Sequence, residues 1–433
     1  MRPALLRVRG GGRRQTEDSV MLRVLIVGGS GFIGRHVAGR LDTQGHAVVA
    51  PSRRTLDLVR DDEAQMREAL AGFDVVVNCA GVARGATMTR LHGGETIALI
   101  RAAAATGVKR FVHVSALGVT NRGDTIYQRS KAAAEDFLES FDPAGARLDW
   151  RVLRPSVVIG RGGASFDLQL ALAALPVIPS VGAGLWRIQP VHVDDLAELV
   201  ARLVEGAAGP RKIDVVGPAP ITTNDLSLIL RDWLGLPRAK FWSVPTPLLK
   251  LGARFAGTFT RLPLNAELVT MLSRGNVSDP APMTAALGRS PRALKQALAV
   301  EPACDADRTA ARLYFVRPLL RWSLALLWIA SGVLSFGLYP VEKSYEILRL
   351  LNFSGALAAA TLYGAAAIDL SLGLLLLLRW RTTAVGVAQL LVMSVFTLLA
   401  IGLPADYWLH PFAPLLKNLP LAAATLVMIA LES

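Results

Sequence analysis

Short apolar runs rich in β-branched residues recur through the first 160 residues of the chain, with stretches of helical spacing between them. Such runs are typical of strands buried on both faces of a parallel sheet, and the stretches between them indicate crossover helices, for example 97–106. The alternation predicts an α/β Rossmann fold with a doubly wound parallel sheet. The predicted strands are 22–27, 46–50, 74–78, 110–114 and 150–153.

The apolar pattern also suggests domain boundaries. Residues 1–20 are rich in Arg and Gly and contain no apolar core of a secretory signal, so we expect a disordered extension. Residues 21–160 form the expected Rossmann core. In 161–310 the elements are shorter and Pro and Gly more frequent, which predicts a small substrate subdomain interleaved with the core. Its clearest elements are a strand at 212–216 and a helix at 225–234.

The Pro-punctuated stretch 245–263 has apolar residues at helical spacing beside basic ones. This pattern fits an amphipathic helix lying on a membrane surface and fits a helix packed on its own domain equally well. The apolar positions are Leu248, Leu251, Phe255 and Phe259, and the basic ones are Lys250, Arg254 and Arg261.

The last part of the chain, 313–433, is far more apolar than the rest. About 20 apolar residues cross the hydrocarbon of a bilayer as a helix. The sequence therefore predicts an all-α bundle of four transmembrane helices that is embedded in the lipid bilayer. The expected spans are about 320–341, 355–378, 382–403 and 411–431, the last interrupted by Lys417.

The net charge of +13 is carried mainly by Arg. Because these Arg are scattered and form no nucleic-acid motif, we expect attraction to anionic headgroups and no nucleic-acid partner. Arg312, Arg317 and Arg321 flank the first span, and Arg379 and Arg381 link the second and third. By the positive-inside rule these segments are cytoplasmic. We expect a multi-pass inner (cell) membrane protein whose Rossmann domain and C-terminus are cytoplasmic.

A glycine-rich turn directly follows the first predicted strand and opens a helix. Its residues are Gly28, Ser30, Gly31, Phe32, Ile33 and Gly34, in the pattern Gly-x-x-Gly-x-x-Gly. Glycines at this place let the backbone approach a pyrophosphate, which then lies at the helix N-terminus. The position between strand and helix indicates a dinucleotide site, although a run of glycines alone is also consistent with a tight turn.

The end of the second strand bears on which cofactor binds. NAD sites usually place an Asp or Glu there, whereas this chain has Arg53 and Arg54. A guanidinium suits the 2′-phosphate of NADP through its charge and planar donors. The sequence thus favours NADP(H) over NAD(H); the alternative is a solvated surface pair.

Tyr127 and Lys131 lie four residues apart, on one face of a predicted helix. A phenol with a pKa of about 10 is a poor proton donor at neutral pH, and a neighbouring ammonium is expected to lower that pKa. Ser115, at the end of a strand, is positioned to bond a substrate oxygen. These three residues are the predicted catalytic group for hydride transfer to a carbonyl, although Lys131 can also serve only to hold a ribose.

Metal binding is not predicted. The two cysteines, Cys79 and Cys304, lack metal-ligand spacing and fit a reducing compartment. One histidine, His192, beside the two acids Asp194 and Asp195 is weak evidence for a metal site. Asp194 is better explained as the N-cap of the following helix.

The series GGSGFIG, VVVNCAG, RFVHVSALGV, YQRSK, LRPSVVIG and QPVHVDDLA, in this order, resembles the extended or atypical short-chain dehydrogenase/reductases. The resemblance covers about 21–300 and is greatest to the branch that contains the nucleotide-binding accessory subunit of respiratory complex I. It implies that Asp57 meets the adenine and that Ala80 and Gly81 line the cofactor. It also implies that Tyr127 and Lys131 face the ribose and nicotinamide, with Pro155 and Val157 near the carboxamide.

The tail resembles the DoxX-like membrane proteins through WSLALLWIASG, DLSLGLLLLL and HPFAPLLKNLPL. Some relatives in that family are associated with quinone-linked oxidoreductases, which implies a quinone or a membrane redox complex as partner. Asp369 lies inside the second span and is a candidate functional residue; the alternative is a hydrogen bond to Ser or Thr of a neighbouring helix.

Two functions agree with these observations. The first is an NAD(P)H-dependent oxidoreductase that acts on a membrane-associated carbonyl or quinone-like substrate. The second is a non-catalytic NADPH-binding module that senses the cofactor or stabilises a membrane complex.

Overall fold

A computed structural model describes residues 20–82, 85–249, 251, 266–409 and 415–432 of the chain. The chain divides into two compact units, residues 1–311 and 312–433. The expected extension before residue 20 and most of the amphipathic stretch 245–263 lie outside the described residues.

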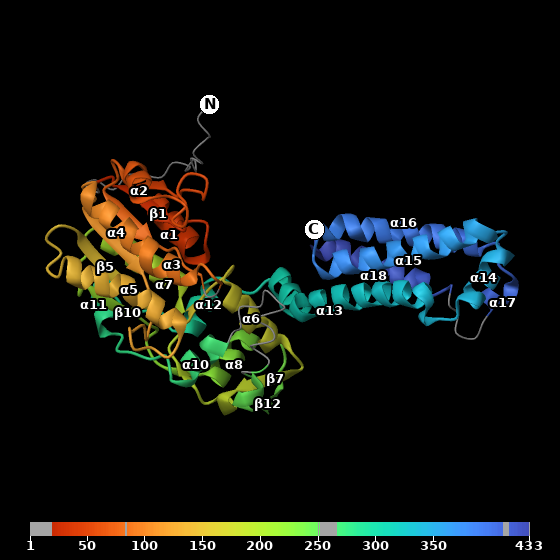
Figure 1. The fold of residues 1–433 in the computed structure, drawn as a ribbon. Coiled ribbons are helices and arrows are strands. Elements are labelled where there is room, and N and C mark those ends of the chain that lie inside the picture. The colour runs from red at the N-terminus through yellow and green to blue at the C-terminus, as the bar shows by residue number, and fades with distance from the viewer. Residues whose placement is uncertain (1–19, 83–84, 250, 252–265, 410–414, 433) are drawn as a thin grey trace. The chain divides into compact units, whose positions relative to one another are not determined.

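The first unit is built on a parallel sheet in the order β10-β5-β4-β3-β1-β2 (Figure 1). The chain runs from β1 to β2 on one side and returns to β3 on the other, so the order reverses between β1 and β3, where such folds bind ligands. The predicted Rossmann fold is confirmed, with strand limits within two residues of those expected. The strands are β1 (Arg23–Val27), β2 (Ala47–Val49), β3 (Val75–Asn78), β4 (Arg110–Val114), β5 (Asp149–Pro155) and β10 (Lys212–Val215).

Helices cover both faces of the sheet because alternate strand residues point to opposite sides. Val24 and Ile26 of β1 pack against one set of helices, and Leu25 and Val27 against the other. The first face is covered by α1 (Phe32–Thr43), α7 (Val193–Val204) and α11 (Ala281–Leu287). The second is covered by α2 (Glu63–Leu70), α4 (Thr96–Ala105) and α5 (Ile126–Phe141).

Smaller sheets and helices form a second hydrophobic core beside the sheet, around Phe166, Ile188 and Leu230. Three two-stranded sheets contribute: β6 (Val158–Ile159) with β9 (Val191–His192), β7 (Val177–Val181) with β12 (Lys240–Val244), and β8 (Arg187–Ile188) with β11 (Ile221–Thr222). The helices are α6 (Ala164–Ala174), α8 (Thr223–Trp233), α10 (Ala266–Ser273) and α12 (Leu294–Val300).

The cap of α7 differs from the expectation. His192, not Asp194, is the N-cap, and its Nδ1 accepts from the backbone N–H of Asp194 at 3.3 Å. Asp194 lies in the first turn, where its carboxylate contacts His192 and His36, and these contacts hold its pKa well below the usual range. His192 is the N-cap because its backbone is extended, as an N-cap requires, whereas Asp194 already lies within the helix.

The second unit is a helical bundle. Its long helices are α13 (Asp305–Val333), which begins in the first unit, α15 (Gly355–Leu377) and α16 (Thr382–Ala400); α18 (Asn418–Glu432) packs with them around one apolar cluster. Between them lie a π-helical turn (Leu334–Leu338), α14 (Val341–Leu350) and α17 (Ala405–Trp408). The expected all-α bundle is confirmed. Its fourth predicted span, 411–431, lies partly outside the described residues, and α18 is the helix described there.

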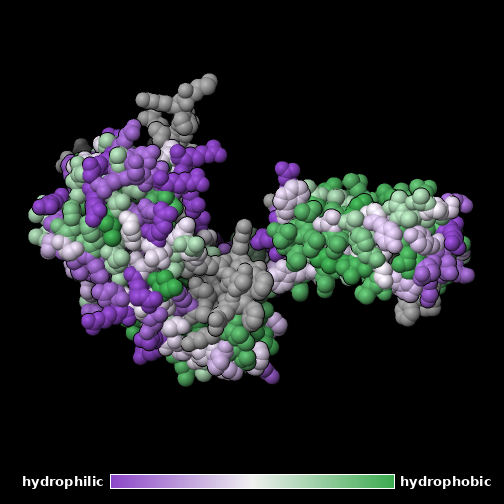
Figure 2. All heavy atoms as spheres, in the orientation of Figure 1, coloured by the Kyte–Doolittle hydropathy of each residue, from purple (hydrophilic) through white to green (hydrophobic). Residues whose placement is uncertain are grey.

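The surface of this bundle is apolar along its helices (Figure 2). Leu326 and Leu391 are 67 % and 64 % exposed, which is costly in water and favourable in lipid. Among the described residues, three helices are long and apolar enough to cross a membrane: 305–338, 355–377 and 382–400. The protein is therefore a membrane protein.

Candidate cofactor and active site

The glycine turn is packed too closely for side chains. A Cβ on Gly34 would lie 2.3 Å from the carbonyl oxygen of Gly28, and one on Gly28 would lie 2.7 Å from the backbone nitrogen of Ala80. Gly28 also has a φ of +76°, which favours glycine. The N-cap Gly31 provides no side-chain cap, so the first N–H groups of α1 remain available to an anion. This geometry fits the diphosphate of a dinucleotide.

The second strand brings the two arginines to the same edge. A Cβ on Gly29 would lie 2.5 Å from the Cβ of Ala50, so the end of β2 touches the glycine turn. Arg53 and Arg54 follow in a turn, and both are exposed. Asp57 is half-buried and accepts from the N–H of Val59 at 3.0 Å.

The remaining expected cofactor residues follow the carboxyl ends of parallel strands, which share one edge of the sheet. Ala80 and Gly81 follow β3, and Ala80 donates its N–H to Asn78 Oδ1 at 3.0 Å. Pro155 ends β5, and its carbonyl accepts from Leu117 at 2.9 Å. Val157 lies two residues further, partly buried in the second core. The topology therefore brings these segments to the edge where the glycine turn lies.

Tyr127 and Lys131 face this edge from the first turns of α5. The helix begins at a capping box between Thr125 and Gln128, which fixes where Tyr127 enters. Lys131 is 5 % exposed, its Nζ donates to the carbonyl of Val114 at 3.0 Å, and it lies 6.0 Å from the centre of the Tyr127 ring. A Cβ on Gly81 would lie 3.6 Å from this Nζ.

Burial, and not the ammonium group of Lys131, determines the pKa of the Tyr127 phenol. Desolvation raises the pKa of Tyr127 to about 12, so the expectation that Lys131 lowers it was wrong. The Lys131 ammonium gives one of its three hydrogens to Val114. Burial lowers the pKa of Lys131 to about 8, an effect that the negative charge of Glu135 partly offsets. Without cofactor, Tyr127 is therefore a protonated phenol at neutral pH.

Ser115 is turned toward a buried ionic cluster. Its hydroxyl donates to Glu135, one helical turn beyond Lys131 on α5. Glu135 is 1 % exposed and also pairs with Arg154 and Lys212. In the described part of the chain the Ser115 hydroxyl bonds Glu135 and not Tyr127.

His92 is a neighbour of Tyr127 that sequence reasoning missed. It lies in a π-helical turn, Leu91–Glu95, after the short helix α3 (Met88–Arg90), and its ring meets the Tyr127 ring edge-on at 5.5 Å. Its Nε2 accepts from the N–H of Val82 at 3.1 Å, so the proton is on Nδ1, which bonds Ser130 Oγ at 3.0 Å. Burial, with the charge of Lys131, lowers the pKa of His92 to about 3. No local sequence pattern around His92 predicts that its neutral imidazole contacts Tyr127.

Glu267 of α10 was missed as well. Its carboxylate accepts from the backbone N–H groups of Ile126 at 3.2 Å and Tyr127 at 3.4 Å, where α5 begins. An acid at a helix N-terminus also interacts favourably with the helix dipole. A second link lies beside the first, because Arg274, directly after α10, pairs with Asp124, just before α5, at 2.6 Å. The subdomain thus holds the start of the helix that carries Tyr127.

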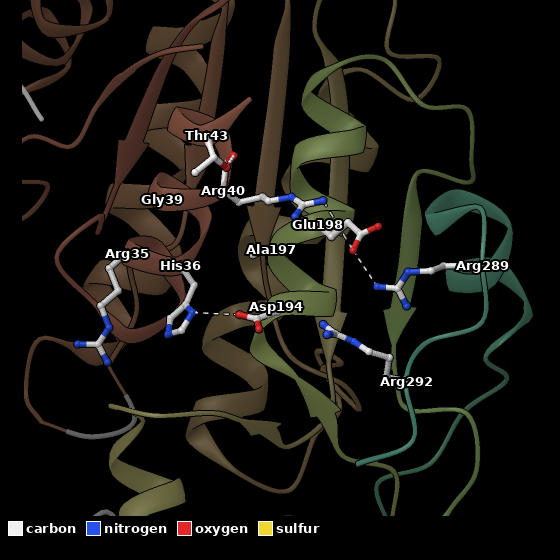
Figure 3. Close-up of a pocket in the computed structure, with 10 residues that line it drawn as sticks. All are labelled: Arg35, His36, Gly39, Arg40, Thr43, Asp194, Ala197, Glu198, Arg289 and Arg292. Carbon is white, nitrogen blue, oxygen red and sulfur yellow. Dashed lines mark hydrogen bonds and ion pairs between the residues drawn. The ribbon is translucent and has the colours of Figure 1, made fainter. Parts of the chain in front are cut away.

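A cavity also lies elsewhere, between α1 and α7 (Figure 3). It measures about 840 Å³ and is lined by four arginines and two acids. Of these groups, Asp194 contacts His36 at 3.3 Å and Glu198 bonds Arg289 at 2.7 Å. A smaller cavity of about 420 Å³ lies beside Gly118, Gln128 and Asn276, at the start of α5. We take the second as the neighbourhood of the site, because it adjoins the helix of Tyr127.

The described residues hold no group of three or more His, Cys, Asp and Glu placed to bind a metal ion. Both cysteines are free thiols. Burial raises the pKa of Cys79 to about 12, so this thiol stays protonated at neutral pH.

Comparison with known families agrees with this geometry. Residues 24–217 match the NAD dependent epimerase/dehydratase family, and residues 325–426 match the DoxX-like family. The resemblance of both parts is confirmed. The first match supports a nicotinamide cofactor without deciding between NAD and NADP.

Curated relatives resemble the first unit. The chain is 26 % identical over 272 residues to the Arabidopsis thaliana protein "NADH dehydrogenase [ubiquinone] 1 alpha subcomplex subunit 9, mitochondrial", covering 56 % of this chain and 64 % of that protein. It is 28 % identical over 241 residues to "Epimerase family protein SDR39U1" of Bos taurus, covering 50 % of this chain and 82 % of that protein. The chain thus spans less than two thirds of the Arabidopsis relative.

Solved structures of similar fold include MoeE5 in complex with UDP-glucose and NAD, with 21 % identity, a TM-score of 0.49 and coverage of 67 % of this chain and 99 % of that one. Another is UDP-glucose-4-epimerase from Stenotrophomonas maltophila with bound NAD, with 18 % identity, a TM-score of 0.49 and coverage of 68 % and 98 %. Similarities of this size bear on neither the substrate nor the reaction.

We expect the titration of Lys131 to make cofactor affinity dependent on pH. Its ammonium is present below its pKa of about 8 and is lost as pH rises through that value. If the ammonium donates to the ribose, the Kd for NADPH rises by up to about tenfold between pH 7 and pH 9.5, as expected for one charged hydrogen bond. Fluorescence titration of NADPH measures this, and Lys131→Met should remove the dependence. A Kd that changes equally in both proteins would contradict the assignment.

Proposed function

We propose that the protein is a membrane-anchored, NADPH-dependent reductase of the short-chain dehydrogenase/reductase type. Its proposed substrate is a membrane-associated carbonyl or quinone-like compound. The observation that carries the proposal is the pair of half-buried Tyr127 and buried Lys131 near the sheet edge that also holds the glycine turn. A membrane anchor concentrates the enzyme where apolar substrates dissolve.

The residues have distinct proposed roles. Gly28, Gly31 and Gly34 admit the diphosphate, and Lys131 holds the ribose. The bound nicotinamide supplies the hydride. Tyr127, which is protonated at neutral pH, donates the proton to the substrate oxygen. Its pKa of about 12 without cofactor makes it a weak acid, so this role needs the bound cofactor and substrate to bring the pKa nearer to neutral. Ser115 would bond the substrate oxygen after its hydroxyl leaves Glu135.

The test of this function is turnover by the purified full chain in detergent. NADPH is added with a panel of quinones and lipid-like aldehydes and ketones, and absorbance of the reduced nicotinamide is followed. Oxidation of NADPH with stoichiometric reduction of an acceptor supports the reductase. Tight NADPH binding without oxidation by any acceptor supports the second candidate.

That second candidate is a non-catalytic NADPH-binding module that senses the cofactor or stabilises a membrane complex. The bond of Ser115 to Glu135 favours it, because that bond withdraws one expected catalytic hydroxyl from the site. The similarity to a relative named as a subunit of NADH dehydrogenase [ubiquinone] is compatible with it. We propose a quinone or a membrane redox complex as partner in either case, with the first unit and the C-terminus on the cytoplasmic side of the inner membrane.

If the protein prefers NADP(H), replacing Arg53 and Arg54 should weaken the binding of NADPH and not that of NADH. Replacing both by Ala removes the exposed guanidiniums that we assign to the 2′-phosphate, whose charge-assisted bonds contribute about 1.5–3 kcal/mol each. We expect the Kd for NADPH to rise at least about tenfold while the Kd for NADH stays within about twofold. Arg67→Ala is the control, because Arg67 is exposed on α2 and pairs with Glu63 of its own helix. Equal effects on both cofactors would refute the assignment.

A further inference from the structure

The membrane unit carries polar side chains that the proposed reduction does not use. Trp328 of α13 is 5 % exposed, Asp369 of α15 is 5 % exposed and Gln389 of α16 is 0 % exposed. The buried faces of these helices pack around one apolar cluster, which includes Trp328 itself. The three side chains therefore face the interior of the bundle and not the lipid.

All three lie at a similar depth. Glu432 binds Arg321 at 2.7 Å and Arg379 at 3.4 Å, which marks one end of the bundle. From that end, Trp328 comes seven residues after Arg321, and Asp369 comes ten before Arg379. Gln389 comes seven residues after Thr382, where α16 begins. At 1.5 Å per residue, the three form one layer about 10–15 Å from the charged end.

The layer is short of hydrogen bonds. Among the described residues, Trp328 Nε1, Asp369 Oδ1 and both amide atoms of Gln389 have no partner. Elsewhere the bundle does pair such groups: Asn418 donates to Thr397 at 2.9 Å, and Thr425 donates to the carbonyl of Leu421 at 2.9 Å. A polar group without a protein partner is unfavourable in an apolar interior, so three helices with such groups at one depth are suited to bind a ligand that carries polar atoms.

One bond fixes the orientation of the layer. Asp369 Oδ2 accepts from Ser331 Oγ of α13 at 2.7 Å, which leaves Oδ1 as the free atom. The same two helices approach closely on either side, since a Cβ on Gly332 would lie 2.8 Å from the carbonyl of Ala366 and one on Gly373 would lie 2.9 Å from that of Ala325. The hydrogen bond of Asp369 to a serine of a neighbouring helix, which the sequence offered as an alternative, is present. It involves one of the two carboxylate oxygens, Oδ2.

We propose that this layer binds the oxygen atoms of a lipid-soluble compound that carries carbonyl or hydroxyl groups on an apolar body. Trp328 Nε1–H and the amide nitrogen of Gln389 donate to a ligand oxygen. Asp369 Oδ1 and Gln389 Oε1 accept from a ligand hydroxyl. The apolar cluster contacts the body of the ligand. This site is separate from Tyr127 and does not depend on hydride transfer.

The test is binding to the full chain in lipid nanodiscs without nucleotide. The probes are 1,4-naphthoquinone and 1,4-naphthalenediol, with naphthalene as the probe of equal size without oxygen. Calorimetric titration, corrected by empty nanodiscs, should show saturable binding of the oxygenated probes only. Gln389→Leu and Trp328→Phe should each weaken that binding at least about tenfold, the value of one buried hydrogen bond to a polar partner. Ser371→Ala is the control, because Ser371 is exposed and bonds Ala367 of its own helix.

The unfolding temperature separates a ligand site from a structural bond. Gln389→Leu removes an unpaired amide, so it should leave the unfolding temperature unchanged or raise it while binding is lost. A lower unfolding temperature would show that the amide is satisfied within the protein and would overturn the proposal. Equal binding of naphthalene and the oxygenated probes would also overturn the proposal. The same holds if no probe binds saturably, which is the result expected when only water fills the layer. Tyr127→Phe should bind the probes normally, so failure of the reductase and failure of this site are distinguishable.

Discussion

Replacing Tyr127 by phenylalanine is expected to reduce the rate of NADPH-dependent reduction by a factor of about 10²–10⁴, the usual contribution of a general acid. The ring and its packing against His92 are retained, because only the hydroxyl is removed. Lys131 keeps its bond to Val114, so the ribose contact that we assign to it is preserved. The Kd for NADPH should therefore change less than about threefold, which fluorescence titration measures beside the steady-state rate.

The control is Tyr339→Phe, the same chemical change on a residue of the second unit that is 45 % exposed. It should leave both the rate and the Kd unchanged. If Tyr127→Phe turns over like the unchanged protein, the phenol is not the proton donor and the catalytic assignment fails. If both proteins bind NADPH and neither oxidises it, the binding-module function is supported instead.

The second large effect is expected from Gly34→Ala. The added Cβ would lie 2.3 Å from the carbonyl of Gly28 and 2.8 Å from the Cα of Gly29, both backbone atoms that cannot move aside cheaply. Opening the turn displaces the N–H groups that we expect to meet the diphosphate. We predict a rise of at least about 100-fold in the Kd for NADPH and a loss of about 2 kcal/mol or more in the free energy of unfolding of the first unit.

The same helix offers a matched control. Gly39 of α1 is exposed, and a Cβ there would meet nothing within 4 Å. Gly39→Ala should stabilise the first unit by about 0.5–1 kcal/mol, because Ala is the better helix former, and should leave NADPH affinity unchanged. Thermal unfolding of both variants, followed by circular dichroism, checks the contrast. Similar stability of Gly34→Ala and Gly39→Ala would contradict the close packing of the turn.

The strands and the glycine turn could be predicted because their signals are local. The runs RVLIV, VVVN and RFVHV are mainly apolar, and each is followed at once by residues at the sheet edge. Parallel strands then bring Gly28, Ala80 and Pro155 together without further information. The membrane bundle was predictable for the same reason, since length and hydropathy alone mark its helices.

The protonation of the site could not be predicted, because it depends on burial. Sequence spacing placed Lys131 one turn from Tyr127, but it could not show that Lys131 bonds Val114 or that desolvation dominates the pKa of the phenol. The contacts of Ser115 with Glu135 and of Tyr127 with His92 join separate elements through side-chain packing. The cap of α7 was missed because a histidine is an uncommon N-cap and two aspartates stood beside it.

The contact of Glu267 with the start of α5 has a kinetic consequence. The carboxylate that receives the N–H groups of Ile126 and Tyr127 lies 141 and 140 residues further along the chain. During synthesis, α5 can form and pack on the sheet long before that acid leaves the ribosome, but its first turn stays incompletely bonded until then. Local contacts form early and distant ones late. A nascent chain therefore acquires its nucleotide-binding turn well before it acquires a fully anchored Tyr127.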